Sequence, residues 1–260
     1  MTVRDDRGDA VPLGGGPQAV VSLVPSLTET LATSVPGRLV GATDYCVEPP
    51  GLDVARVGGS KYPKIERVIA LRPDLVVANV EENRREDVVR LREAGIPVWV
   101  TEAPATVPAA LGSLRRLLVE GFGVAAPGWL GEAERLWAPV RPAWARAIVP
   151  VWRRPWVVLG RDTFAGDVLR RLGVTNALGG DAERYPRPPL DELRAMFADG
   201  RADLLVLPDE PYAFTGGDGP EAFPGARYVL VSGRHLTWWG PSLVEAHRRL
   251  AGAFDVPNDR

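Results

Sequence analysis

Aromatic side chains at the ends of expected strands and helices are the residues whose types and spacing point most clearly to chemistry. Several adjoin prolines, as in Arg154-Pro155-Trp156, Tyr185-Pro186 and Gly240-Pro241. Rigid aromatic side chains give contact area at little entropic cost, so they suit a large, flat, partly apolar ligand such as a corrin or an aromatic siderophore. The alternative is ordinary packing in a core or hinge. The residues concerned are Tyr45, Trp152, Trp156, Tyr185, Tyr212, Trp238 and Trp239.

Four arginines also lie at expected loops, and their forked donors suit carboxylate, phosphate or catecholate groups of a ligand. The alternative for each is a solvated surface side chain, which we favour for at least two of them. The four are Arg153, Arg154, Arg161 and Arg234.

A direct metal site is a further reading, because thiolate, carboxylate and imidazole groups all bind metals. The candidates form no paired ligand motif, and a lone cysteine is more often a small buried hydrophobe. We therefore predict no metal-ligating residue and no covalently bound cofactor, so any metal should arrive inside its chelate. The candidates are Asp44, Cys46, Glu48 and His235.

An enzyme is the competing function. The chain has no Gly-x-Gly-x-x-Gly fingerprint, no phosphate-binding loop and no Gly-x-Ser-x-Gly elbow. Its two histidines, His235 and His247, give a thin acid/base repertoire. We predict no catalytic residues, and a Cys46→Ala variant that lost a measurable turnover would revive the enzyme reading.

The elements that must position these side chains alternate between strands and helices, which predicts parallel α/β sheets. In the first half, Ser26 and Glu29 resemble a capping box, Asn83 a helix cap and Gly95 a helix end. The expected strands are 19–24, 39–43, 75–78 and 96–100, and the expected helices begin near 26, 65 and 83.

A long helical stretch without a strand begins at Val107, with Thr106 as its cap, and separates two strand-bearing regions. In the second region Asp162 is the expected cap and Gly173 the end of one helix. The expected strands are 148–151, 156–159, 204–207 and 228–231, with helices at 190–198 and 242–254. A weak repeat relates 72–77 to 201–206. The predicted division is an α/β lobe at 18–103, a connecting helix at 104–125 and a second α/β lobe at 126–257.

The charge and the N-terminal residues limit the partners. A formal net charge of -2 gives no basic field for nucleic acid or an anionic membrane. No run has the apolar length of a secretory signal or a membrane helix. As written, the chain is predicted to be soluble, cytoplasmic and monomeric, without membrane insertion. The single cysteine, Cys46, rules out an internal disulfide.

Segments in a consistent order resemble the class III solute-binding proteins, the cobalamin and iron-siderophore binders of ABC importers in the helical backbone metal receptor superfamily. The resemblance covers about 20–250. The matching segments are 22–31, 43–46, Pro49-Pro50, 57–59, 65–78 and 95–98. It implies two Rossmann-like lobes joined by a backbone helix, with small hinge motion and a metal chelate held between the lobes.

The resemblance also implies roles for single residues. Tyr45 and Tyr185 match positions that present aromatic side chains to the ligand, one from each lobe, and Trp152 or Trp156 with Trp238 would complete the cleft; Arg154 is our choice among the arginines. The family's permease-docking carboxylates correspond to Glu82, Glu86 and Asp191, in a group that also holds Glu81 and Glu192. The alternative for these acids is a solvated helix start.

Family members are usually extracytoplasmic, which leaves two biological uses open. One is the binding component of an importer for a corrinoid or ferric siderophore. The other is a cytosolic chelate sensor or carrier without a transporter.

Overall fold

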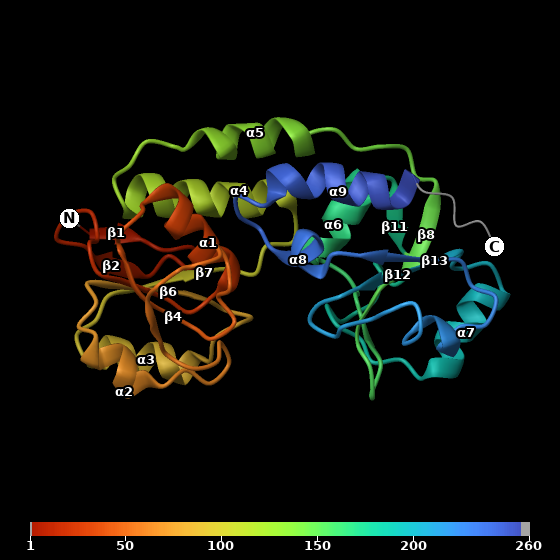
Figure 1. The fold of residues 1–260 in the computed structure, drawn as a ribbon, viewed down its shortest axis with the longest axis horizontal. Coiled ribbons are helices and arrows are strands. Elements are labelled where there is room, and N and C mark those ends of the chain that lie inside the picture. The colour runs from red at the N-terminus through yellow and green to blue at the C-terminus, as the bar shows by residue number, and fades with distance from the viewer. Residues whose placement is uncertain (1, 256–260) are drawn as a thin grey trace. The chain divides into compact units, whose positions relative to one another are not determined.

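The computed structural model describes residues 2–255, except the side chain of Asp255, and it falls into two compact units (Figure 1). Unit 1 consists of 2–103, 111–131 and 239–241, and unit 2 of 104–110, 132–238 and 242–255. The domain boundaries predicted from the sequence stay a prediction, and residues 256–257 of the second predicted lobe lie outside the described residues.

Unit 1 is built on a five-stranded parallel sheet with the strand order β5-β4-β3-β6-β7. Every residue of β3, β6 and β7 is buried, as expected for strands that are covered on both faces. The predicted α/β class with parallel sheets is therefore confirmed. The strands are β3 (Val20–Ser22), β4 (Leu39–Ala42), β5 (Ala55–Arg56), β6 (Leu75–Asn79) and β7 (Val98–Thr101).

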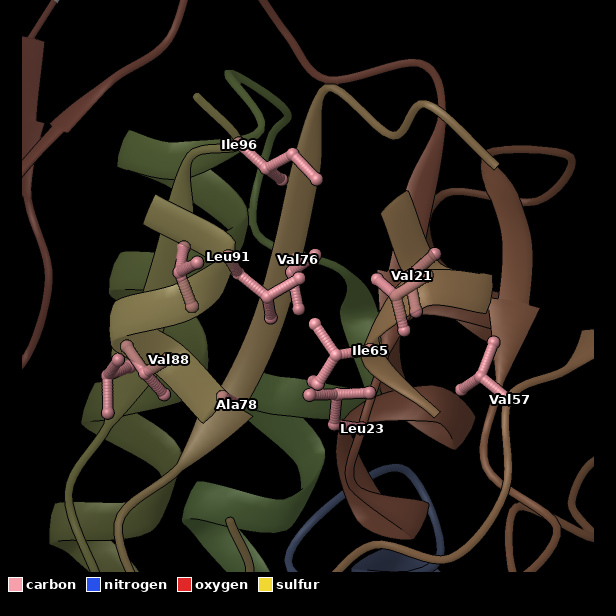
Figure 2. Close-up of a cluster of buried hydrophobic side chains, with 12 residues drawn as sticks. Val21, Leu23, Val57, Ile65, Val76, Ala78, Val88, Leu91 and Ile96 are labelled. Atoms are coloured by element: carbon pink, nitrogen blue, oxygen red, sulfur yellow. The ribbon is translucent and has the colours of Figure 1, made fainter. Parts of the chain in front are cut away.

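Helices cover both faces of this sheet, with α2 and α3 on one side and α1 and α4 on the other (Figure 1). Figure 2 shows the core on the first side, where Val76 and Ala78 of the inner strand β6 join Ile65 and Leu91 in one cluster. Burying such a side chain contributes about 1.5–3 kcal/mol. The helices are α1 (Pro25–Ser34), α2 (Ile65–Ala70), α3 (Arg85–Glu93) and α4 (Val107–Arg116), which continues as a π-helix over Leu117–Gly121. The first turn of α4, up to Ala110, belongs to unit 2.

An N-terminal hairpin, β1 (Thr2–Arg4) with β2 (Ala10–Pro12), is an element that the sequence analysis missed. Its turn lies against the edge strand β7: the Asp6 N–H donates to the Val100 carbonyl at 3.3 Å, and the Val100 N–H donates to the Asp5 carboxylate at 3.2 Å. Burial raises the pKa of Asp5. The hairpin thus covers an edge that would otherwise expose unpaired backbone groups.

Unit 2 has a four-stranded parallel sheet, β11-β8-β12-β13, and a separate two-stranded hairpin, β9-β10. The strands are β8 (Ala145–Ile148), β9 (Pro150–Trp152), β10 (Val157–Val158), β11 (Val174–Asn176), β12 (Leu204–Pro208) and β13 (Tyr228–Val231). The helices are α5 (Gly128–Trp137), α6 (Phe164–Arg171), α7 (Leu190–Ala198), the 3-10 turn Pro220–Ala222, α8 (Gly233–Thr237) and α9 (Leu243–Asp255). Of these, α5 begins in unit 1, since the division of the chain falls after Gly131.

Three predicted helix caps are wrong. The box of Ser26 and Glu29 does not form, because Pro25 is already the first helical residue and Val24 is therefore the N-cap. Asn83 is buried by contacts to other loops, and Arg84 is the N-cap of α3. The residue that caps α6 is Thr163, not Asp162.

The other predicted helix signals are confirmed. The Thr106 hydroxyl accepts from the Ala109 N–H at 3.2 Å, and Gly95 and Gly173 have φ angles of 78° and 83° at helix ends. No helix within residues 2–255 has both the length and the apolar character needed to cross a bilayer.

Candidate ligand-binding site

The carboxyl ends of parallel strands are where α/β sheets place ligands, and in unit 1 the loops there expose two phenol rings. Tyr45 follows β4 and is 67% exposed, while Tyr62 follows β5 and is 69% exposed. Tyr45 was predicted from the sequence to lie at this place, and Tyr62 was not. The Tyr62-Pro63 pair repeats the aromatic–proline signal used for Tyr185 and would have identified it.

The Tyr62 ring is covered on one side by the guanidinium of Arg84, whose central carbon lies 4.9 Å from the ring centroid. Arg84 is held in turn by two hydrogen bonds of 2.9 Å to the buried carboxylate of Asp87. These hydrogen bonds raise the pKa of Arg84. One face of the exposed Tyr62 ring therefore packs against the Arg84 guanidinium, which Asp87 holds in place.

Buried polar side chains hold the loop that carries Tyr45. The Thr28 hydroxyl donates to the Cys46 thiol at 3.0 Å, and Thr43 contacts both that thiol, at 3.1 Å, and the Ser60 hydroxyl, at 3.3 Å. Burial raises the pKa of Cys46. A neutral buried thiol hydrogen-bonded to hydroxyls acts as a structural group, which is the alternative that we gave for this cysteine.

Two asparagines extend this arrangement across the sheet. The Asn83 amide donates to the Ser60 carbonyl at 2.9 Å and the Leu23 carbonyl at 3.3 Å, and accepts from the Asn79 N–H at 2.9 Å. The Asn79 amide donates to the Thr101 hydroxyl at 3.0 Å. The loops after β3, β5, β6 and β7 are thereby linked to one another through buried side chains.

In unit 2 the loops after the strands also expose aromatic side chains. Trp152, at the tip of the β9-β10 hairpin, is 45% exposed, and Tyr185, after β11, is 39% exposed. The Trp152 ring lies edge-on to Tyr212, with centroids 5.7 Å apart. The centroid of the Tyr212 ring in turn lies 4.6 Å from that of the Phe214 ring. The exposed indole is thus the outer member of a packed aromatic cluster.

Two of the predicted contacts are core residues in this structure. Trp156 is 9% exposed and stacks on Phe214 with centroids 6.1 Å apart. Trp238 is equally buried, with the Arg234 guanidinium 5.4 Å from its ring centroid. Trp239, in unit 1, is buried as well. All three tryptophans are therefore packed inside the protein, which is the alternative to ligand contact.

The arginines divide in the same way. Arg153 forms ion pairs with Asp218 and Glu221 and lies 5.3 Å from the Trp156 centroid, so its donors are used within the protein. Arg154 is exposed and has a φ angle of 65°, and Arg161 is exposed beside Asp162. Arg154 forms no ion pair with another described residue, whereas the Nε of Arg161 lies 3.6 Å from the Asp162 carboxylate and leaves its terminal nitrogens open to a ligand.

The loop that carries Tyr185 is held against the stretch after β10. The Gly160 N–H donates to the Arg184 carbonyl at 2.8 Å, and the Arg161 N–H donates to the Glu183 carbonyl at 3.2 Å. A methyl group at Gly160 would collide with the Glu183 carbonyl oxygen, so only glycine permits this approach. The backbone just before Tyr185 is therefore fixed by hydrogen bonds to the stretch after β10.

The direct metal reading gains no support from the described residues. His235 is buried, its Nδ1 lies 2.8 Å from the Ser232 hydroxyl, and burial together with the Arg234 charge lowers its pKa. Among side chains within 2–254, no three His, Cys, Asp or Glu groups lie close enough together to hold an ion. The prediction that a metal arrives inside its chelate stays a prediction.

The predicted docking carboxylates are all exposed. Glu86 lies in the first turn of α3, 3.5 Å from Arg84, and Asp191 lies in the first turn of α7, 3.2 Å from Arg194. Glu82 precedes α3 and is also exposed. Their places fit both readings, since a helix start favours acidic residues without any partner.

Three relatives show what the chain resembles. A vitamin B12-binding protein of Pectobacterium carotovorum is 30% identical over 238 residues, 88% of this chain and 78% of that protein. One from Vibrio cholerae is 30% identical over 84 residues, 32% of this chain and 30% of that protein. An ABC transporter substrate-binding lipoprotein of Bacillus subtilis is 33% identical over 101 residues, 38% of this chain and 32% of that protein. The chain thus spans about a third of several relatives and most of another.

Solved structures share the fold. A periplasmic heme-binding protein from Roseiflexus in its apo form superposes with a TM-score of 0.76 at 21% identity, over 92% of this chain and 98% of that one. No protein-family profile matches the sequence. The relatives are solute-binding proteins and not enzymes, as predicted for this chain. The chain belongs to the class III family of solute-binding proteins, which includes the vitamin B12-binding proteins.

Proposed function

We propose that this chain binds a metal chelate, with a corrinoid as the first candidate, through the loops at the carboxyl ends of its parallel strands. The observation that carries the proposal is the exposure of Tyr45 and Tyr185 on loops, and of Trp152 at the end of β9 in the hairpin that follows β8, all held in place from beneath. Large apolar side chains exposed on rigid loops bind flat ligands without a further ordering cost. Tyr62 joins this set.

The chemistry of the loops fits a chelate better than a bare ion. Aromatic rings supply stacking area for a macrocycle, and the open donors of Arg154 and Arg161 suit its phosphate or carboxylate groups. The metal then keeps the ligands of its own macrocycle. The relative that spans most of the chain is named for vitamin B12, which supports a corrinoid over other chelates.

Thermal unfolding with and without ligand tests the proposal. We expect cobalamin or cobinamide to raise the Tm, since a ligand that binds only the native state stabilises it. Hemin and a ferric catecholate siderophore are the comparison ligands, and a larger shift with either would change the chelate but keep the class. No shift with any of the four would contradict the proposal.

Two variants locate the site. Tyr45→Ala and Trp152→Ala should each weaken the affinity about tenfold, as expected for the loss of one stacking aromatic. Trp144→Ala is the matched control, because that indole is 43% exposed but stands before β8 rather than after a strand. An equal loss of affinity in the control would contradict the assignment of the carboxyl-end loops.

We further propose that the chain serves an ABC importer, docking on its permease through Glu82, Glu86 and Asp191. The relatives with periplasmic or lipoprotein names support an extracytoplasmic place, whereas the cytoplasmic place predicted from the sequence stays a prediction. A Glu86→Lys/Asp191→Lys double variant should keep ligand affinity but lose uptake of labelled ligand by the native host. Glu66→Lys, an exposed acid on α2, is the control.

The alternative is a chelate sensor or carrier without a transporter. Fractionation of the native host with an antibody against the chain separates the two. Recovery in the cytosol with unchanged uptake in a deletion strain would favour the carrier.

A further inference from the structure

Unit 1 contains a pocket of about 560 Å³ on the side of α3 and the N-terminal hairpin, and neither Tyr45 nor Tyr62 lines it. Its volume lies within the range of small-molecule sites, roughly 300–1,000 Å³. The apolar walls are Val80, Val88, Val89 and Val100. Asn79 and Asn83, which support the carboxyl-end loops, also line this pocket, but none of the exposed aromatic residues of the proposed chelate site does.

Three arginines line the pocket, and two of them are fixed by ion pairs. Arg92 reaches Asp9 at 2.9 Å and the buried Asp5 at 3.3 Å, and Arg7 reaches Glu102 at 3.1 Å. Because both partners of Arg92 lie on the hairpin, the guanidinium is placed without the rotamer search of a free arginine.

Arg85 is the third arginine, and it differs from the other two. It stands at the first position of α3, is exposed, and forms no hydrogen bond or ion pair with another described residue. Its five donors are therefore open to a ligand in the pocket. Asp9 is the one carboxylate in the lining, and it is already paired with Arg92.

We propose that this pocket binds a small organic anion. A carboxylate, sulfonate or phosphate group would pair with Arg85, with Arg7 and Arg92 adding positive potential. The apolar body would lie against Val88, Val89 and Val100. An inorganic anion alone would leave the exposed Val89 side chain uncovered, and a neutral apolar ligand would leave Arg85 without a partner, so the lining selects a molecule with both parts.

The probe is 8-anilinonaphthalene-1-sulfonate, which combines a sulfonate with an aromatic body and fluoresces when bound in an apolar site. It is titrated against the folded full chain at low ionic strength. Arg85→Glu should weaken binding at least about tenfold, since a charge-assisted hydrogen bond is replaced by repulsion. Arg67→Glu, an exposed arginine on α2 outside the lining, should change the affinity less than about twofold.

Two further measurements locate the probe. Val89→Asp should weaken binding as Arg85→Glu does, and bound probe should slow amide hydrogen exchange in α3 and β7. Trp152→Ala should leave the titration unchanged. Equal affinity in the wild type and Arg85→Glu, no binding at all, or loss of binding in Trp152→Ala would each overturn the proposal. None of these outcomes bears on the chelate, whose test uses other ligands and residues.

Discussion

The two units fasten the start of a central strand in the same way but support their carboxyl-end loops by different means. In unit 1, Asp74 stands just before β6, its N–H donates to the Ala19 carbonyl at 2.8 Å, and its carboxylate accepts from the Gln18 and Ala19 N–H groups. In unit 2, Asp203 stands just before β12, its N–H donates to the Arg146 carbonyl at 2.9 Å, and its carboxylate accepts from the Arg146 N–H.

At the carboxyl ends this likeness stops. Unit 1 supports the loop of Tyr45 with buried hydroxyl and thiol groups and with the Arg56 guanidinium, and it supports Tyr62 with Arg84 and its ion pair to Asp87. Unit 2 supports its exposed indole with stacked rings and with Arg153 between two carboxylates. The hydrogen bonds at the amino ends of the strands are thus common to both sheets, whereas the support of the carboxyl-end loops differs between the two units.

Trp156→Ala should give the largest effect, because it opens a cavity in the aromatic core of unit 2. We expect a loss of about 3–5 kcal/mol in the free energy of unfolding, measured by urea denaturation. Trp152→Ala, at the outer end of the same cluster, should cost only about 1 kcal/mol. A similar cost for both would contradict the separation of a core indole from an exposed one.

Asn79→Ala tests the polar support of unit 1 against its counterpart in unit 2. Asn79 ends β6 and Asn176 ends β11, and each accepts from the N–H two residues on while donating to a neighbouring loop. Asn79 is buried and Asn176 is not, so water replaces the lost bonds only at Asn176. We expect losses of about 2–4 and about 1 kcal/mol, respectively.

Urea unfolding of each variant measures these two losses in the free energy of unfolding. Their order shows whether the Asn79 or the Asn176 hydrogen bonds contribute more to stability. A larger loss at Asn176 would mean that the loop contacts of unit 2 matter more than burial. Asn79→Asp serves as a control that keeps the acceptor oxygen and removes the donor.

Asp74→Ala and Asp203→Ala test the shared feature at the amino ends. The Asp74 carboxylate accepts two backbone N–H groups and that of Asp203 accepts one, and both side chains are exposed. We expect losses of about 1–2 kcal/mol and about 1 kcal/mol, with the order fixed by the number of bonds. Asp203→Asn keeps its one acceptor oxygen and should retain stability, whereas Asp74→Asn keeps only one of its two acceptors and should lose part of it. Equal losses from the Asp→Asn and Asp→Ala variants would contradict this account.

The sequence predicts those parts of the molecule that depend on near neighbours in the chain. Buried apolar runs such as Leu75 to Ala78 identify parallel strands, and the repeat of 72–77 in 201–206 identifies equivalent strands. Exposed loop aromatics such as Tyr45 follow from their place after a strand. The sequence does not predict the role of a side chain when that role depends on a partner far away in the chain.

Arg153 and Trp156 show why. The arginine was a candidate for ligand contact until the structure placed Asp218 and Glu221 beside it, and these lie more than sixty residues along the chain. Trp156 has the same local signal as Tyr185, a neighbouring proline, but Phe214 and Phe223 cover it. The hairpin of β1 and β2 was not predicted, because its charged turn shows no apolar periodicity. Its place depends on Arg92 and Val100, which are distant in the sequence and donate hydrogen bonds to Asp5.

His235, on α8 of unit 2, provides the smallest test, because its buried surroundings shift its pKa. Burial and the Arg234 and Arg249 charges lower its pKa below the ordinary 6.5, while Glu245 opposes them. The unfolded chain therefore binds a proton at a higher pH than the folded chain does. The contribution of His235 to stability is complete above the unfolded pKa, and falls as pH drops below it toward the folded pKa.

Urea unfolding at several pH values between about 7 and 5.5 measures this effect. Wild type should lose up to about 1.4 kcal/mol per pH unit more than His235→Asn does below about pH 6.5, because the asparagine carries no titrating group. His247, whose pKa burial also lowers, is present in both proteins and cancels in the difference. Parallel pH profiles for the two proteins would show that the His235 pKa is the same in the folded and unfolded states, and would contradict this account.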